Sequence, residues 1–555
     1  MKSLRLILAL FPAFGLPLSA LAQNAPAPAE PPSFFGEAID VRVVNVEAVV
    51  TDRQGNRVSD LKQGDFHLQV DGKEVPISFF TEVRDGRPAA APPGTEPGEA
   101  VGTGYLVFID DYFSTAVRRD EVLRAIQKDL ARLGPRDSMA VVAFDGARLT
   151  PLSGWTSSAA DLGRALDAAL ARPARGLDRI SELRSFLESQ DFSDHINDDG
   201  PHDPIKERIV NGGLREQERA YGDMLVRQVD GAVSAAVSAM RGAGTPRGRK
   251  VMLLLAGGWP FSIQSFVRGA APTTASTELP SGEQMLRPLT STANLLGFTI
   301  YPIDVPGIES GASQASSFAA PRAGAAAALS ALGTSLASDN LREQEAEGSL
   351  SFLARETGGR AMLNGLRAEA LTKAADDVRS YYWLGFTPAW ERNNRRHEVK
   401  VVVQRPGVRV RSRNSFLDLS TKAELSIRME SALLFGRLPD AIVMPMKLGA
   451  PVRSKTDTDI PLTLALPVSA MTVIPSGGKF LAHLELRIAA SDENGNRSDV
   501  PYLPLDLSAD KLPKPDGFVR YDTKIKIHGK AHHLVVATYD PMSGKIATAE
   551  ADLAP

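Results

Sequence analysis

Short apolar runs alternate with amphipathic segments through the middle of the chain. The runs have the length of buried strands and span 105–109, 139–144, 251–255 and 298–303. Apolar residues recur at helical spacing in the intervening and following segments, at 117–133, 159–170, 341–356 and 366–380. Strands and helices in alternation predict a doubly wound parallel sheet with helices on both faces. We assign this α/β region to residues 104–380.

The segments on either side of the α/β region have the pattern of β-strands. Residues 37–85 contain short β-branched runs separated by turn sequences such as Asp52-Arg-Gln-Gly-Asn56, and residues 381–418 return to the same pattern. Because 37–85 is short for an independent core, we expect the strands of 381–418 to complete one β-sandwich with it. The α/β region would then be an insertion within that sandwich, reached through a Pro- and Gly-rich linker at 86–103.

The last part of the chain predicts a further β domain. Residues 419–455 suit a connecting helix and a linker. Residues 456–555 contain several short strands at regular spacing, with turn sequences between them. This pattern favours a C-terminal immunoglobulin-like β-sandwich.

Two stretches interrupt the alternation within 104–380. Residues 172–227 are highly charged and include a group of acidic residues close to two histidines: Asp191, Asp194, Asp198, Asp199 and Asp203, with His195 and His202. They predict either an insertion that binds a cation or a partner, or a solvated and partly helical excursion. Residues 310–338 are rich in Ala, Gly and Ser, which favours a flexible loop.

The N-terminus has the features of an export signal. A positive start precedes an apolar core and an A-x-A pattern, so residues 1–22 predict a cleavable signal peptide, with an uncleaved anchor as the alternative. Residues 23–36 then suit a disordered spacer. No later stretch reaches the roughly 20 apolar residues of a membrane span. We therefore expect an exported protein, periplasmic, at the cell surface or secreted, with no stable membrane insertion after cleavage.

Composition and motifs narrow the class of function. The net charge of −3 comes from interspersed charges, which disfavours a nucleic-acid partner. The absence of cysteine removes thiolate catalysis and thiolate metal sites. The sequence has no G-x-S-x-G or H-E-x-x-H pattern, so no catalytic residue is assigned.

Polar residues gather directly after the first strand of the α/β region. Asp110 and Asp111 follow the apolar run at 105–109, and Ser114 and Thr115 come shortly after. In open α/β sheets, ligands bind at the carboxyl ends of the strands. Two further carboxylates, Asp145 and Asp304, also follow apolar runs and would meet the first pair at this edge. Either these side chains help to hold an ion, or they cap helices and form turns.

Several separate motifs, in order, resemble a bacterial family of secreted proteins called VWFA-related, which is built around a von Willebrand factor A-type domain. The resemblance covers roughly residues 37–416. It rests on Val49-Val-Thr-Asp52 with Asp60-Leu61 and Asp65-Phe66, on 106–110, on Asp137-Ser-Met-Ala-Val-Val-Ala-Phe144, on 250–258, on Leu353-Ala-Arg-Glu-Thr-Gly-Gly359, and on Tyr382-Trp-Leu-Gly-Phe386 with Arg413-Asn-Ser-Phe416.

The resemblance implies a metal-ion-dependent adhesion site, in which a D-x-S-x-S loop, a threonine and a second aspartate surround Mg²⁺ or another divalent cation. Asp110 and Ser114 match the first and last loop positions, but Tyr112 replaces the middle serine. The second aspartate is missing, because the chain has Gly257 at that step. The sequence does not decide which of Thr150, Thr156 and Thr245 would be the threonine.

The site therefore has two interpretations. In the first, Asp110 and Ser114 bind a divalent ion, with Asp111 and Asp304 as weaker candidate ligands. In the second, an ion-free rim formed by Tyr112, Thr115, Asp145 and Gly257 binds a partner.

The leading functional hypothesis is a non-catalytic adhesion or scaffold protein that binds another protein through its A-type domain. One alternative is a structural spacer whose β domains or long insertion make the contacts. The other is an uncharacterised hydrolase, for which the sequence offers no motif.

Overall fold

The structure is a computed structural model, and it separates into two compact units. Residues 43–435 form one unit, and residues 1–42 with 436–555 form the other. The structure describes residues 6–8, 43–90, 101–198, 204–243, 248–268, 279–305, 325–435, 441–453, 457–491, 498, 500, 502–528 and 533–553. The chain is a mixed α/β protein with additional β-sheets, which confirms the coarse fold class predicted from the sequence.

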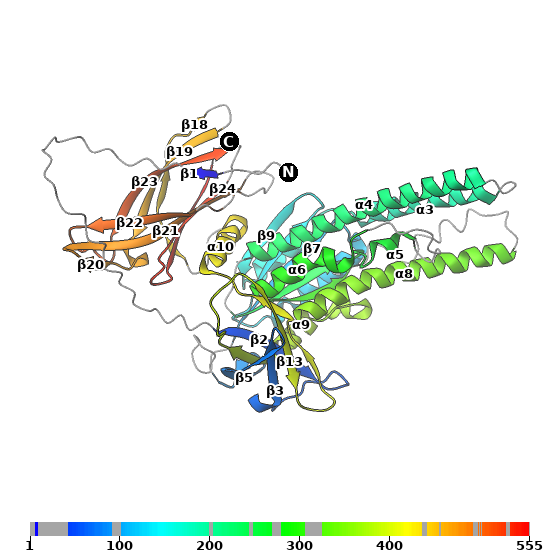
Figure 1. Cartoon of the computed structure of the whole chain (residues 1–555), viewed down its shortest axis with the longest axis horizontal. Helices are drawn as coiled ribbons and strands as arrows, with labels where there is room; N and C mark the ends of the chain where they lie inside the picture. The colour runs from blue at the N-terminus through cyan, green and yellow to red at the C-terminus, as the bar shows by residue number, and fades with distance from the viewer. Residues whose placement is uncertain are drawn as a thin grey trace. The chain divides into compact units, whose positions relative to one another are not determined.

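A five-stranded sheet lies at the centre of the larger unit (Figure 1). Its order is β11-β10-β7-β8-β9. The strands are β7 (Thr103–Asp110), β8 (Ser138–Phe144), β9 (Leu149–Thr156), β10 (Arg249–Ala256) and β11 (Phe298–Asp304). Strands β11, β10, β7 and β8 are parallel to one another, and β9 is antiparallel to β8.

The predicted parallel sheet is found in β11, β10, β7 and β8, and the structure adds the antiparallel strand β9 at one edge. β9 was not predicted because Pro151 and Gly154 interrupt its sequence, and neither favours a strand interior. Its pairing with β8 also shifts register twice, so the strand depends on its neighbour more than on its own pattern.

β7 occupies the middle of the sheet because both of its faces are apolar. Every residue from Thr103 to Asp110 is buried. Leu106 and Phe108 belong to the core on one face, and alternate residues such as Val107 belong to the core on the other. The first face is covered by α4 (Pro204–Gly242), α5 (Ile263–Arg268), α6 (Gly282–Leu296) and α8 (Ala325–Thr357), and the second by α1 (Ala116–Asp129), α2 (Ala159–Leu170) and α9 (Ala370–Arg379).

The charged stretch at 172–227 forms helices. α3 (Gly176–Asp198) and α4 run side by side as a long hairpin (Figure 1), and the rings of Phe186 and Tyr221 stack between them at a centroid distance of 4.3 Å. The side chains of the acidic residues and histidines that were singled out in this stretch lie outside the described residues. The partly helical interpretation agrees with this backbone.

The predicted flexible loop at 310–338 is wrong in its second half. Residues 306–324 lie outside the described part, but α8 begins at Ala325 and continues through 338. The Ala-rich composition that suggested a loop also has the highest helix propensity, and tertiary packing of the rest of α8 favours the helix.

Strands from both flanks of the α/β region pair with each other. The two sheets have the orders β14-β2-β12-β5-β6 and β15-β13-β3-β4. Their strands are β2 (Val44–Thr51), β3 (Phe66–Val70), β4 (Lys73–Val75), β5 (Phe79–Arg84), β6 (Arg87–Pro88), β12 (Tyr381–Phe386), β13 (Arg396–Val403), β14 (Arg409–Arg411) and β15 (Ser415–Leu417). A shared core joins them, with Phe66 packed 5.0 Å from Tyr382 between ring centroids.

The predicted helix-and-linker segment at 419–455 is divided between the two units. α10 (Thr421–Phe435) belongs to the larger unit, because Ile427 is buried in the core of the α/β sheet. The β domain begins before residue 456, since β16 (Ile442–Val443), β17 (Met446–Leu448) and β18 (Val452–Arg453) already pair with its later strands.

The smaller unit consists of two sheets over a common apolar core. Its remaining strands are β1 (Leu6–Leu8), β19 (Asp457–Pro467), β20 (Ile474–Ser476), β21 (Lys479–Ser491), β22 (Tyr502–Ala509), β23 (Phe518–His528), β24 (His533–Tyr539) and β25 (Ile546–Asp552). β1 lies in the predicted signal peptide and pairs antiparallel with β23; the rest of 1–22 and the spacer at 23–36 lie outside the described residues. No helix in the described part of the chain has the length and apolarity of a membrane span.

Candidate functional site

The candidate site begins where β7 ends and the chain turns toward α1. Asp110 is fully buried, and its Oδ1 accepts hydrogen bonds from the backbone N–H groups of Tyr112 at 3.1 Å and Phe113 at 3.2 Å. The backbone N–H of Ser114 donates to the Asp110 carbonyl at 3.2 Å. The carboxylate therefore fixes the turn that follows its own strand.

The second oxygen of Asp110 is bound by a tryptophan. Trp259 Nε1 donates to Asp110 Oδ2 at 2.8 Å, and the Trp259 side chain is almost fully buried. Trp259 follows β10 after two glycines, of which Gly258 has a φ of +72° that favours glycine. The indole N–H thus comes from the same loop in which the resemblance implies a second aspartate.

The Asp110 carboxyl lies in an environment that disfavours its charge. Burial raises its pKa to about 7, while the N–H groups of Trp259 and Phe113 oppose the rise and the nearby charge of Asp111 adds to it. No guanidinium or ammonium group is among these influences. Asp110 is therefore a buried acid held by neutral donors.

The neighbouring Asp111 is held by two arginines. Its Oδ1 accepts from Arg119 at 2.7 Å, and its Oδ2 accepts from Arg172 at 2.7 Å. Arg119, like Asp111, is almost completely buried, and it also pairs with Asp120 at 2.9 Å. Burial raises the pKa of Asp111, and the two guanidinium groups oppose that shift.

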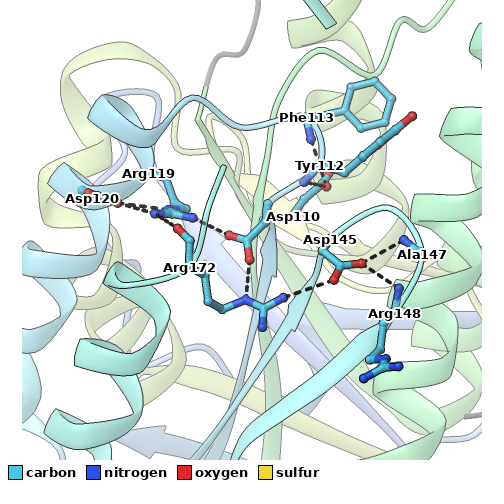
Figure 2. Close-up of polar contacts among 10 residues, drawn as sticks. Asp110, Tyr112, Phe113, Arg119, Asp120, Asp145, Ala147, Arg148 and Arg172 are labelled. Carbon is cyan, nitrogen blue, oxygen red and sulfur yellow. Dashed lines mark hydrogen bonds and ion pairs between the residues drawn. The ribbon is translucent and has the colours of Figure 1, made fainter. Parts of the chain in front are cut away.

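Arg172, which binds Asp111, also lies beside Asp145 at the end of the next strand (Figure 2). Its guanidinium lies 3.8 Å from Asp145 Oδ2. Asp145 also accepts from the backbone N–H groups of Ala147 at 2.9 Å and Arg148 at 2.7 Å, which lowers its pKa below the ordinary value despite partial burial. Asp145 is thus a turn former, as one interpretation of the sequence predicted.

The remaining loop residues pack against the start of α3. Ser114 is buried, its carbonyl accepts from Gly176 N–H at 2.9 Å, and its Oγ has no hydrogen-bond partner. Thr115 is partly exposed at the N-cap of α1. The ring of Tyr112 lies under the Arg179 guanidinium at 4.2 Å and tightly against Gly146, where an added Cβ would come within 2.2 Å of the ring.

Two predicted site residues do not join this group. Asp304 ends β11 at the same sheet edge, but its side chain lies 3.4 Å from Arg367. Gly257 is buried, so it does not belong to an exposed rim as predicted.

The three candidates for the threonine of the implied ion site lie on β9 or outside the described residues. Thr150 and Thr156 lie in β9, and Thr156 Oγ1 accepts from Ser158 N–H. Thr245 lies outside the described residues.

The chemistry of the donor set argues against a divalent cation. Such an ion needs several free oxygen ligands, but both oxygens of Asp110 accept N–H groups and both oxygens of Asp111 accept guanidinium groups. The unpartnered Ser114 Oγ is a single neutral oxygen. Across the described residues, no three acidic or histidine side chains come together as metal ligands would. These residues do not fit the ion that the resemblance implies.

Millimolar Mg²⁺ or Mn²⁺, added at constant ionic strength, is therefore expected to leave the melting temperature of the full chain unchanged. A cation that binds only the folded state would raise it by mass action. Differential scanning fluorimetry of the wild type and of Asp110→Ala measures this. An increase in the wild type that Asp110→Ala abolishes would contradict the ion-free interpretation.

Three residues that hold this site together were not singled out from the sequence. Arg119 had a detectable signal, because it shares the helical spacing of Val122, Leu123 and Ile126 and so lies on the buried face of α1. Arg172 and Trp259 had none, because each depends on the path of a loop. The sequence showed only that an expected aspartate is missing near Trp259.

Comparisons with known proteins do not identify a family for this chain. No family model matches the chain, and no curated protein matches it. A solved structure of a β-glucosidase from Kluyveromyces marxianus in complex with glucose is 9% identical, with a TM-score of 0.12. The match covers 58% of this chain and 33% of that one, so the chain spans about a third of that protein, and a likeness this low bears on neither fold nor activity.

Proposed function

We propose that the chain is an exported, non-catalytic protein-binding protein of the VWFA-related kind. In this proposal the α/β region is an A-type domain inserted in a β-sandwich, and the smaller unit is an immunoglobulin-like domain. The pairing of β12 with β2 and β5 supports the insertion, because it joins strands from both flanks of the α/β region. The order of motifs along 37–416 supports the family.

The observation that carries the binding function is an exposed apolar pair at the carboxyl end of the sheet. Val117 is 77% exposed and Leu177 is 67% exposed. Val117 follows Thr115 by two residues, and Leu177 follows Gly176, whose backbone lies against Ser114 and Thr115. Each of the two residues therefore lies within two positions, along the chain, of this backbone contact. In this proposal the rim keeps Tyr112, Thr115 and Asp145, adds Val117 and Leu177, and no longer includes the buried Gly257.

The rim offers a partner apolar contacts on a fixed frame. The buried Asp110 and Asp111 networks hold the loop from below, so little ordering would be needed on binding. Binding in this mode is independent of divalent ions. Burial of one such aliphatic side chain contributes about 1.5–3 kcal/mol.

The double variant Val117→Asp/Leu177→Asp is expected to lose partner binding by about 100-fold or more, because two apolar contacts become buried charges. Its melting temperature should stay close to that of the wild type, since both side chains are exposed. The immobilised full chain would capture proteins from an extract of the source cells in EDTA, and the captured protein would then be titrated against each variant.

A matched control separates this proposal from the spacer alternative. Leu512 is 64% exposed in the smaller unit, so Leu512→Asp places the same charge on a different surface. Retention of the partner by Leu512→Asp and its loss by the rim variant supports binding at the rim. The opposite result would favour contacts through the β domains.

A further inference from the structure

A polar cavity lies at the opposite edge of the central sheet from the rim. It opens where β10 and β11 begin, and strands of the β-sandwich close its other side. Its volume is about 150 Å³. Since a water takes about 30 Å³ in the liquid, the cavity has room for a few waters or one small polyatomic ion. The side chains that define its chemistry are Asn45, Glu47, Arg249, Lys250, Trp383 and Arg413.

Positive charge exceeds negative charge around this cavity. Arg411 also lines it but is neutralised by Asp377, at 2.7 Å and 2.8 Å, and Arg249 lies 3.1 Å from Glu47. Lys250 and Arg413 have no carboxylate at ion-pair distance within the described part of the chain. Neither cation therefore has an ion-pair partner of its own in this part of the chain, although the charge of Glu47 acts on both.

Lys250 and Arg413 bind only backbone carbonyl groups. Lys250 Nζ donates to the Leu296 carbonyl at 2.7 Å. Arg413 donates to the carbonyl of Asn294 at 3.3 Å and also to that of Asn45. Burial and then the nearby Arg413 lower the pKa of Lys250 to about 8. The two cations thus lie close enough to repel each other.

Several buried N–H groups at the cavity lack an acceptor. Arg413 Nε and Trp383 Nε1 have no hydrogen-bond partner, and Arg249 Nε makes none of hydrogen-bond geometry despite its closeness to Glu47. Buried donors without acceptors cost free energy. Asn45 Oδ1 is also unpartnered, but a flip of that amide would present an N–H instead. The buried N–H groups at the cavity therefore need hydrogen-bond acceptors that the described residues do not provide.

We propose that this cavity binds a small oxyanion, such as phosphate, sulfate or a small carboxylate. Its oxygens accept from Arg413 Nε and Trp383 Nε1, and its charge is neutralised by Arg413 and Lys250. Because Trp383 and Arg413 belong to the sandwich segments and Lys250 belongs to β10, the bound anion links the β-sandwich to the central sheet.

Isothermal titration of the full chain with inorganic phosphate, in a phosphate-free buffer of constant ionic strength, tests the proposal. The wild type is expected to bind. Loss of a charge-assisted hydrogen bond should weaken binding about tenfold or more in Arg413→Met and in Lys250→Met. Trp383→Phe removes a neutral donor but keeps an aromatic ring, and should weaken binding about fivefold. It also provides a test if the charge variants fail to fold.

The matched control is Arg409→Met, because Arg409 is exposed on β14 and does not line the cavity. It should bind phosphate as the wild type does. Parallel titrations with sulfate and acetate decide which oxyanion class is preferred, and chloride is the control for ionic strength. Absence of binding by all three oxyanions, an equal effect of chloride, or an equal loss in Arg409→Met would each overturn the proposal.

Discussion

Asp111→Ala is expected to lower the free energy of unfolding of the larger unit by about 3 kcal/mol, because it leaves a buried arginine without its main partner. The carboxylate of Asp111 has no exposed surface, and the guanidinium of Arg119 is 1% exposed. Removal of one member of such a pair costs more than the pair contributes. Arg119 would keep only Asp120 and the carbonyl of Arg172, so the cost lies at the lower end of the range for buried pairs.

Tryptophan fluorescence during urea unfolding of the full chain measures this effect. All four tryptophans, at 155, 259, 383 and 390, lie in the 43–435 unit, so the signal reports that unit alone. The matched control is Asp120→Ala, which removes the partly exposed partner of Arg119 and should cost about 1 kcal/mol or less.

A double variant separates the cost of an unpaired charge from the loss of the contact. Asp111→Ala/Arg119→Met should be less destabilised than the sum of its single variants, because no charge remains buried without a partner. Equal losses in Asp111→Ala and Asp120→Ala would contradict the role assigned to the buried pair.

The sequence predicted those parts of the fold that local patterns determine. The apolar run at 105–109 identified β7, and its carboxyl end is where Asp110 and Asp111 lie. β9 escaped prediction because Pro151 and Gly154 obscure it, and its pairing with β8 is a tertiary effect.

The partners of the site could be predicted only in part. The helical spacing of α1 places Arg119 on the buried face, but not the acid it meets. Trp259 donates an N–H group from the loop in which the resemblance implies a carboxylate, so the sequence motif could not indicate this contact. The oxyanion cavity draws on residues near 45, 250, 383 and 413, so no local motif could indicate it.

Asp110 is expected to make the stability of the larger unit depend on pH near neutrality. Its pKa is about 7 in the folded chain and has an ordinary value of 3.8. Between pH 3.8 and about 7, the folded state therefore keeps a proton on Asp110 that the unfolded state has released. The stabilisation is complete below about pH 4 and is lost as the pH rises through about 7. A shift of about three units corresponds to roughly 4 kcal/mol.

The difference in unfolding free energy between the wild type and Asp110→Asn isolates this contribution. Relative to Asp110→Asn, the wild type should become about 2–4 kcal/mol less stable as the pH rises from about 4 to 8. Asparagine does not titrate, so the hydrogen bonds that it keeps or loses here give an offset that does not depend on pH. Its single amide oxygen cannot accept both from Trp259 and from the loop amides, as the carboxylate does. Asp145→Asn, at the same sheet edge, is the matched control and should retain the wild-type dependence on pH near 7.

The indole of Trp259 offers a direct measurement of the same proton. Its Nε1 lies 2.8 Å from Asp110 Oδ2, so ionisation of the carboxyl should shift its emission with a midpoint near pH 7. Asp110→Asn should remove this transition, and Asp145→Asn should keep it. A wild-type midpoint well below neutrality would mean that three N–H donors outweigh the cost of burial. Asp110 would then be fully charged at neutral pH, and the predicted dependence of stability on pH near 7 would be wrong.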